Sequence, residues 1–360
     1  MSITKNKLED FGLDILRQIN EGKNPAIELP IRSLSNVYFD KQHKVIKIGG
    51  KTAKRFFFNI AHAKKFMQTL LVAAECKKII EEGVTISIRD LYYALKRTIA
   101  NTSENTFDSQ QESDPIIEDL EATLRVLREE LHLNADRKGY VAGPIVLEDH
   151  GDIIDCSRMG SGGWAIPSNV EPEMIRFKEC NARYVLVIEK DAVWQRLNED
   201  KFWKKENCII LTGKGQPARG TRRFIYRLNK ELGLPVYVLT DADPWGYYIY
   251  SVIKQGSINL SFLSERLALP DARFVGLTIA DVDKFGIDTN VTIKLNENDK
   301  KRVKELMKYI WFKPKKWQTE LKNMIKKNYK LELEALSSKG IKFISNYYLP
   351  KKIENKEFLP

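Results

Sequence analysis

The chain has 360 residues, more than one typical core holds, so we expect two domains and an appended segment. Its hydrophobic fraction of 43% and charged fraction of 30% fit a buried core under a solvated surface and exclude wholesale disorder. The 59 Lys and Arg against 48 Asp and Glu give a formal charge of +11, which suits a polyanionic partner but equally a merely basic surface.

The cysteines and histidines argue against a zinc site or a disulfide framework. The four cysteines form no C-x-x-C pair, and the four histidines lack metal-ligand spacing. The first ten residues carry no secretory signal, and no stretch approaches the roughly 18 apolar residues of a membrane span. We therefore expect a cytoplasmic protein with reduced thiols.

The first 60 residues are expected to form an N-terminal extension. It begins with a short helix and a stretch bounded by prolines. Val37–Phe39 and Val45–Ile48 then flank a polar turn, which predicts a β-hairpin that ends at Gly49-Gly50.

Three helices are predicted in the next part of the chain, because apolar residues recur there with helical spacing. Gly83 ends the first helix, and Ser87 is a candidate N-cap for the second. The almost wholly polar stretch 101–115 is expected to be a loop. The helices are predicted over residues 61–82, 89–97 and 116–131.

Two short strands, Tyr140–Ala142 and Pro144–Leu147, follow the third helix. Three helices followed by a β-hairpin is the order of a winged helix, a helix-turn-helix variant that docks in DNA grooves. We therefore assign residues 61–150 to a winged-helix domain. The run Gly160–Gly163 predicts an inter-domain linker over residues 151–170.

Beyond residue 170, strands alternate with helices, which is typical of an α/β domain with a parallel sheet. The part from Glu297 onward is helical and rich in lysine. The expected fold is thus multidomain, α/β and α+β, with a second domain over residues 171–360. Its strands are predicted at 184–188, 208–211, 236–239 and 274–277.

Three acidic residues follow two of these strands. Glu189 comes directly after 184–188, and Asp241 and Asp243 follow 236–239. Ligands gather at the carboxyl ends of parallel strands, so the three carboxylates converge if the two strands are neighbours. Hard oxygen ligands without sulfur or imidazole favour Mg²⁺. The alternative is that each Asp only caps the helix that follows it.

The strings Val187-Ile188-Glu189-Lys190-Asp191-Ala192 and Leu239-Thr240-Asp241-Ala242-Asp243 resemble the Toprim domain of topoisomerases, primases and related nucleases. The acids of that domain bind Mg²⁺ for phosphodiester chemistry. The glycine-rich stretch 212–223 and the run Ser87–Tyr93 narrow the resemblance to the A subunits of type IIB DNA topoisomerases (topoisomerase VI) and the related meiotic double-strand-break transesterases. The resemblance extends from about Ile31 to beyond Phe274 and implies that the second domain is a Toprim domain.

In that family the second tyrosine of an R-[DE]-x-Y-Y motif is the nucleophile, and this position maps to Tyr93. Arg89 lies four residues earlier, on the same helix face, where a guanidinium would stabilise the phosphate or favour the phenolate. The alternative is that Tyr92 and Tyr93 are an aromatic pair that serves packing. We expect Tyr92 to pack and Tyr93 to carry the chemistry.

Lys214, Arg222 and Arg223 are candidate DNA contacts. The glycines between residues 213 and 220 would let the backbone approach a phosphate, and the three cations supply charge. The alternative is a strand-to-helix turn with a solvated basic helix start.

The string Gly49-Gly50-Lys51-Thr52 imitates the end of a Walker A loop. Val45 stands where that motif requires glycine, and no P-loop helix is evident after Lys51, so ATP binding by this chain is not expected. The resemblance implies that a separate ATPase B subunit handles ATP. This chain would then form a homodimer within an A₂B₂ enzyme, with Mg²⁺ as cofactor.

The expected reaction is a Mg²⁺-dependent transesterification. Each protomer would cut one strand of a duplex and retain the 5′ phosphate on Tyr93, and the resemblance implies that Tyr93 meets the carboxylates of the other protomer. A second duplex would pass, so that DNA is relaxed or decatenated. Three alternatives stay open: a break-forming enzyme without strand passage, a Toprim nuclease that uses water, and a non-catalytic DNA-binding protein with the same fold.

Overall fold

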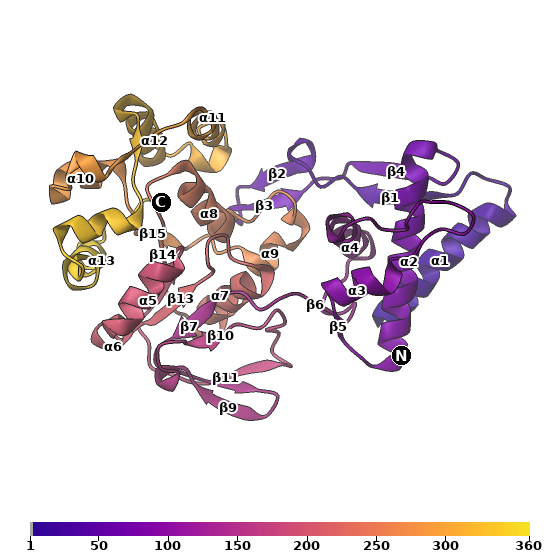
Figure 1. Ribbon diagram of the computed structural model, residues 1–360, viewed down its shortest axis with the longest axis horizontal. Coiled ribbons are helices and arrows are strands. Elements are labelled where there is room, and N and C mark those ends of the chain that lie inside the picture. The colour runs from indigo at the N-terminus through magenta and orange to yellow at the C-terminus, as the bar shows by residue number, and fades with distance from the viewer. Residues whose placement is uncertain (1–2) are drawn as a thin grey trace. The chain divides into compact units, whose positions relative to one another are not determined.

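The computed structural model describes residues 3–360 and divides into two compact units (Figure 1). The first contains the chain up to Tyr38, Ile48–Asp136 and Ile258–Phe262. The second contains Phe39–Lys47, Arg137–Ser257 and Leu263–Pro360. Within residues 3–360, no helix combines the length and apolar character needed to cross a membrane.

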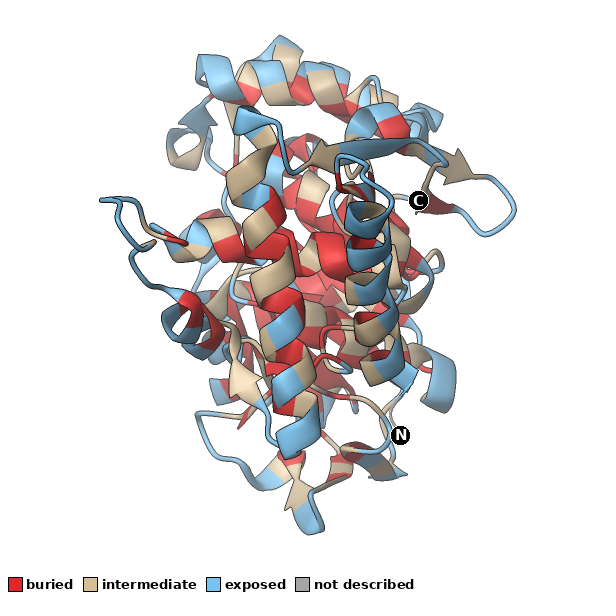
Figure 2. Ribbon diagram, turned by 90° about the vertical axis from the view of Figure 1, so that its right-hand side faces the viewer, coloured by how far each residue is buried: buried red, intermediate tan, exposed pale blue. Residues whose placement is uncertain are grey.

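The first unit is mainly helical. Its core is formed by apolar residues from the helices and the loops between them, including Val72, Cys76, Leu91 and Leu120. In Figure 2 the long helices carry buried residues on one face and exposed residues on the other. The helices are α1 (Ile3–Asn20), α2 (Ile60–Glu82), α3 (Ile88–Leu95) and α4 (Gln110–Leu124), beside an antiparallel pair of β1 (Ala26–Pro30) and β4 (Thr52–Phe56).

The caps of α2 and α3 agree with the sequence prediction. Gly83 ends α2 in the left-handed conformation, with φ of 67°. Ser87 begins α3 with a capping box, because its hydroxyl accepts from the N–H of Asp90 and the Asp90 carboxylate accepts from the N–H of Ser87. The start of the helix that carries Tyr93 is therefore well defined.

The third helix differs from its prediction, because α4 begins at Gln110 and ends at Leu124. Its first turn is stabilised from outside: the Glu112 carboxylate accepts hydrogen bonds from the Gln68 amide and from the N–H of Asp108, both at 3.0 Å. This long-range support lets the helix begin before Pro115, inside the stretch for which the sequence predicts a loop.

The two strands expected to complete a winged helix belong to the second unit. β7 (Tyr140–Ala142) pairs with strands of the large sheet, and β8 (Ile145–Asp149) pairs with β9 (Asp152–Asp155) and β11 (Ile175–Cys180). The first unit instead closes with a short parallel pair, β5 (Ile86–Ser87) and β6 (Leu133–Asn134). The boundary thus lies at residue 136, not 150.

The predicted linker over residues 151–170 is ordered structure. It contains β9 and β10 (Trp164–Ala165), and the side chains of Trp164, Ile166 and Val170 are buried in the core of the second unit. The glycine run Gly160–Gly163 forms the turn before β10. Its glycines therefore serve a turn inside a domain.

The second unit is built on a six-stranded sheet in the order β10-β7-β13-β12-β14-β15. Its four later strands are parallel, as predicted, and β7 and β10 extend it in antiparallel fashion. All residues of β12 and β13 are buried, which explains their continuous apolar sequences. The parallel strands are β12 (Val185–Ile188), β13 (Ile209–Thr212), β14 (Val236–Leu239) and β15 (Arg273–Phe274).

Helices surround this sheet, and those of the C-terminal part are orange to yellow in Figure 1. The hairpin predicted near the N-terminus is present as β2 (Val37–Asp40) and β3 (Val45–Ile48). The longer helices are α5 (Asp191–Glu199), α7 (Arg219–Leu232), α8 (Pro244–Gln255), α10 (Ile279–Phe285), α11 (Glu297–Leu306), α12 (Lys315–Lys327) and α13 (Leu349–Glu354).

A buried ion pair joins the C-terminal helix α13 to α10. The Lys352 ammonium donates to the Asp281 carboxylate at 2.8 Å and to the carbonyl of Gly276 at 2.9 Å. The Tyr348 hydroxyl bonds to the same carboxylate at 3.0 Å. The C-terminal part therefore belongs to the core of the second unit.

Candidate active site

The strands that precede the three acids are neighbours. β12 pairs with β14 in parallel, with Ile188 opposite Leu239. Glu189 and Asp241 consequently leave the same edge of the sheet, as the sequence predicts from the two strand ends.

Glu189 is held against the turn that carries the aspartates. Its Oε2 accepts a hydrogen bond from the N–H of Asp241 at 3.1 Å, and its own N–H donates to the carbonyl of Leu239 at 3.0 Å. Burial raises the pKa of Glu189 to about 8, and the negative charges of Asp241 and Asp243 contribute. The backbone approaches closely here, since a Cβ on Gly246 would lie 2.7 Å from the carbonyl oxygen of Asp241.

Both oxygens of the Asp241 carboxylate have partners. Oδ1 accepts from the N–H of Leu333 at 2.7 Å, and Oδ2 lies 3.2 Å from the Lys190 ammonium. Burial raises the pKa of Asp241 to about 6, although these two partners act in the opposite direction and Asp243 adds to the rise. The site thus concentrates negative charge in a poorly solvated place.

Asp243 caps α8. Its Oδ1 accepts from the N–H of Gly246 at 2.6 Å, and Pro244 occupies the first turn of the helix. Burial raises the pKa of Asp243, against the effect of this hydrogen bond. The capping alternative considered from the sequence is therefore realised for Asp243 in this conformation.

The donor chemistry of these residues fits Mg²⁺, because all three are carboxylates, and a bound cation would offset the cost of burying their charges. Their side chains are not gathered into a coordination sphere. Across residues 3–360, no group of three or more His, Cys, Asp or Glu side chains is arranged so that it could hold a metal ion. In this conformation Asp243 is occupied by its cap contact with Gly246, and Asp241 by its contacts with Leu333 and Lys190.

Lys190, Glu332 and Glu334 join the acids, although the sequence does not predict them there. The Lys190 ammonium lies 2.9 Å from the Glu332 carboxylate and 2.7 Å from that of Glu334. Lys190 could have been suspected from its place next to Glu189. The two glutamates carry no local signal, because only the tertiary fold brings the C-terminal part to this strand edge.

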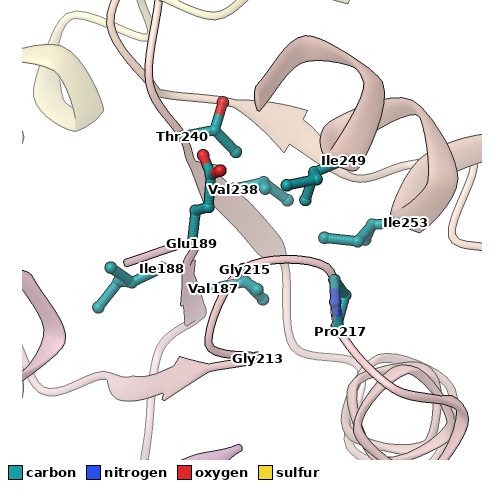
Figure 3. Close-up of a pocket in the computed structure, with 10 residues that line it drawn as sticks. All are labelled: Val187, Ile188, Glu189, Gly213, Gly215, Pro217, Val238, Thr240, Ile249 and Ile253. Carbon is teal, nitrogen blue, oxygen red and sulfur yellow. The ribbon is translucent and has the colours of Figure 1, made fainter. Parts of the chain in front are cut away.

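A pocket lies beside Glu189, between the strand ends, the glycine-rich loop and α8 (Figure 3). Glu189 is the charged residue in its lining, and its carboxylate points toward Thr240. Apart from Glu189 and Thr240, the wall is apolar or glycine: Val187, Ile188, Gly213, Gly215, Pro217, Val238, Ile249 and Ile253. This apolar wall helps to explain why burial dominates the pKa of Glu189.

Tyr93 lies on the exposed face of α3 in the first unit. Its side chain is 59% exposed, whereas Tyr92 is 7% exposed and donates its hydroxyl to the carbonyl of Asp108 at 3.1 Å. The two rings are in contact, with centroids 5.0 Å apart. Arg89 is also exposed, one turn earlier on the same helix. Tyr92 thus packs as expected, and the Tyr93 side chain is exposed.

The three candidate DNA contacts have different environments. Lys214 is exposed, with its ammonium 4.3 Å from the centre of the Tyr140 ring. Arg222 is only 3% exposed, its Nε and Nη2 have no hydrogen-bond partner among the described residues, and burial lowers its pKa to about 10. Arg223 is engaged by the Glu171 carboxylate at 2.8 and 2.9 Å. The predicted basic surface is therefore reduced to Lys214 in this conformation.

Three family models match consecutive parts of the chain. Residues 64–133 match "Type IIB DNA topoisomerase", and residues 138–181 match "All-beta domain in DNA topoisomerase VI alpha subunit". Residues 184–353 match the Toprim domain of Spo11 and of the topoisomerase 6 A subunit. The first two matches meet near the boundary at residue 136 that the structure shows.

Several archaeal proteins, each named as the A subunit of type 2 DNA topoisomerase 6, are similar to this chain over nearly their whole length. The protein of Pyrococcus abyssi is 50% identical, over 98% of this chain and 94% of its own. That of Hyperthermus butylicus is 47% identical over 96% and 93%, and that of Methanocaldococcus jannaschii is 38% identical over 98% and 95%. These likenesses, and the Toprim strand edge with its three acids, show that the chain belongs to the family of topoisomerase 6 A subunits, which are type IIB DNA topoisomerases.

Proposed function

We propose that this chain cleaves and rejoins duplex DNA with Tyr93 as nucleophile. The observation that carries the proposal is the environment of Tyr93: an exposed phenol on a capped helix, with Arg89 one turn away and a buried neighbour, Tyr92, that fixes the helix face. The similar proteins are named as subunits of a DNA topoisomerase, and breaking and rejoining a DNA strand needs a nucleophile.

The proposed step exchanges one phosphodiester for another. The Tyr93 oxygen forms a bond to phosphorus, the bond from phosphorus to the 3′ oxygen breaks, and the phenol proton is lost while the 3′ oxygen gains one. The 5′ phosphate stays on Tyr93. Because the new ester has about the energy of the old one, the reverse reaction reseals the strand without another energy source. Arg89 would stabilise charge on the phosphate during both steps.

Mg²⁺ is the proposed cofactor, with Glu189, Asp241 and Asp243 as its ligands. The ion would supply charge stabilisation for the phosphate and the 3′ oxygen. The support is the chemistry of three carboxylates at one strand edge. Burial raises the pKa of each, and the neighbouring aspartate charges add to the rise for Glu189 and for Asp241. Asp241 and Asp243 would exchange present contacts for the ion. Lys214 is the proposed contact to the DNA backbone, because it is the exposed member of the predicted set.

An ATPase B subunit is the proposed partner, in an A₂B₂ assembly around a homodimer of this chain. The relatives are named as A subunits, which supports a second type of subunit. In this assembly Tyr93 of one protomer would act with the carboxylates of the other. Relaxation or decatenation would then require the partner, whereas cleavage chemistry would reside in this chain.

A covalent-adduct assay tests the nucleophile. The full chain, its ATPase partner, Mg²⁺ and supercoiled DNA are mixed and denatured, and protein bound to DNA 5′ ends is measured. Tyr93→Phe should abolish the adduct and leave DNA binding intact, because only the attacking oxygen is lost.

Tyr92→Phe is the matched control, since it removes a hydroxyl from the adjacent ring and should retain the adduct. Cleavage by Tyr93→Phe that leaves free 5′ ends would show that water is the nucleophile, as in a Toprim nuclease. An adduct that survives the Tyr93 substitution would assign the chemistry to another residue.

A further inference from the structure

Lys190 is a cation built into the acidic site. Its ammonium lies 3.2 Å from Oδ2 of Asp241, 2.9 Å from Glu332 and 2.7 Å from Glu334. It therefore bridges a buried carboxylate of the proposed metal site and two glutamates that are about half exposed. Neither Lys190 nor the two glutamates take part in the proposed transesterification itself.

The two glutamates are held in place by the backbone. Ala242 and Leu331 exchange N–H to carbonyl hydrogen bonds of 2.9 and 3.1 Å, and the N–H of Leu333 donates to Asp241. The segment 331–334 is thus a strap across the turn that carries the aspartates. We call it the acidic strap, because Glu332 and Glu334 lie on it next to Lys190.

The ammonium and a metal ion compete for the same carboxylate. Oδ1 of Asp241 is taken by the strap, and Oδ2 faces Lys190, so a cation that binds Asp241 must share or replace the contact of Lys190. Two like charges on one carboxylate repel each other. If the ammonium leaves Asp241, its charge can still be paired by Glu332 and Glu334, because both carboxylates already accept hydrogen bonds from it.

We propose that Lys190 is a displaceable counterion, which neutralises Asp241 when no metal is bound and is held by the acidic strap when a divalent cation enters. The proposal rests on the proposed metal site. Lys190 would then be a positioning residue that sets the affinity for the metal, and the strap would be the acceptor that makes displacement possible.

The test measures binding of Mn²⁺ to the full chain by electron paramagnetic resonance, without DNA or turnover. Lys190→Met should lower the dissociation constant by about three- to tenfold, because the competing charge is gone. Lys190→Arg keeps a cation and should stay close to the wild type. Lys178→Met, which removes a lysine that pairs with Glu148 on another sheet, should also leave the constant unchanged. Unchanged or weaker binding by Lys190→Met would overturn the proposal.

A double-mutant cycle tests the strap. The pair Glu332→Gln and Glu334→Gln should weaken Mn²⁺ binding in the wild type, and should do so less in the Lys190→Met background, where no ammonium needs an acceptor. An equal loss of Mn²⁺ affinity in both backgrounds would show that the two glutamates act only through their charge. The proposal that they accept the displaced Lys190 ammonium would then be wrong. Failure of the metal site itself is distinguishable, because Glu189→Gln and Asp241→Asn would then bind Mn²⁺ as the wild type does.

Discussion

At the scale of single residues, the site is shaped by competition for carboxylate oxygens. Glu189, Asp241 and Asp243 each accept a backbone N–H, from Asp241, Leu333 and Gly246 respectively. These bonds fix the carboxylates but do not neutralise them, so burial raises all three pKa values. The Lys190 ammonium offsets part of this effect at Asp241, whereas the carboxylates of Glu189 and Asp243 have no salt-bridge partner within residues 3–360.

The raised pKa of Glu189 gives a pH dependence of stability. Folding raises the pKa of Glu189 from its ordinary value of 4.5 to about 8, so the folded chain holds the proton more tightly than the unfolded chain. The stability gained from this proton is fully present below the unfolded pKa and is lost as the pH rises toward about 8. Without metal, the chain should therefore lose stability between pH 5 and pH 8, by roughly 1–3 kcal/mol from this residue.

Glu189→Gln should remove that loss, because the amide does not ionise. Thermal or urea unfolding in metal-free buffer at pH 5 and pH 8 measures it, with Glu148→Gln, at an exposed salt bridge, as the control. If the wild type and Glu189→Gln show the same pH dependence, Glu189 ionises as freely in the folded chain as in the unfolded one.

The residues of the proposed site could be chosen from the sequence only where a local pattern marks them. Glu189, Asp241 and Asp243 follow apolar strand patterns. Tyr93 lies in a helix whose start is marked by the N-cap residue Ser87. Glu332 and Glu334 could not be found, because their role depends on a strap that pairs with the chain about ninety residues earlier. Arg222 was predicted at the surface, yet its helix face packs into the core.

At the scale of elements, side-chain caps begin two of the helices that carry or adjoin the proposed site residues. The Ser87–Asp90 capping box begins α3 and thereby fixes the face that presents Arg89 and Tyr93. Asp243 likewise caps α8 and fixes where that helix begins. A helix that begins at a fixed residue presents its side chains in fixed directions. The caps of α3 and α8 therefore define which side chains each helix presents.

Loss of the α3 cap should be measurable. Ser87→Ala should lower the free energy of unfolding by about 0.5–2 kcal/mol, because the N–H of Asp90 loses its acceptor. Chemical denaturation measures the change. Ser87→Thr retains an acceptor and should be nearly neutral. An equal loss in both variants would show that the hydroxyl does not stabilise α3.

The elements also mark where sequence patterns succeed. The central strands were predicted because complete burial gives continuous apolar runs. β7 and β10 are only three and two residues long, so the same local signal could not assign them to the large sheet. The start of α4 depends on Gln68 in another helix, which a local pattern does not contain.

At the scale of the whole molecule, each unit has its own core, and the second is the larger by chain length. Its C-terminal part is fastened by the buried pair of Lys352 and Asp281. A buried charge without its partner is costly, whereas replacing both charges by apolar groups often is not.

Lys352→Ala should therefore destabilise the second unit by about 3–5 kcal/mol, whereas Lys352→Met combined with Asp281→Leu should cost clearly less. Calorimetric unfolding of the full chain compares them, with Lys351→Ala, at the half-buried neighbouring lysine, as the control. Equal destabilisation by the single and double substitutions would mean that the charges are not the cause.

The pairing of Ala242 with Leu331 has a consequence for how small a working Toprim fragment can be. The aspartate turn takes two backbone partners from a segment that lies beyond all the parallel strands. A fragment trimmed after β15 would keep every strand of the parallel sheet and all three acids, yet would leave the main chain between the aspartates unsupported. The C-terminal segment, which looks like an appendage in the sequence, thus supports the turn that carries two of the three proposed metal ligands.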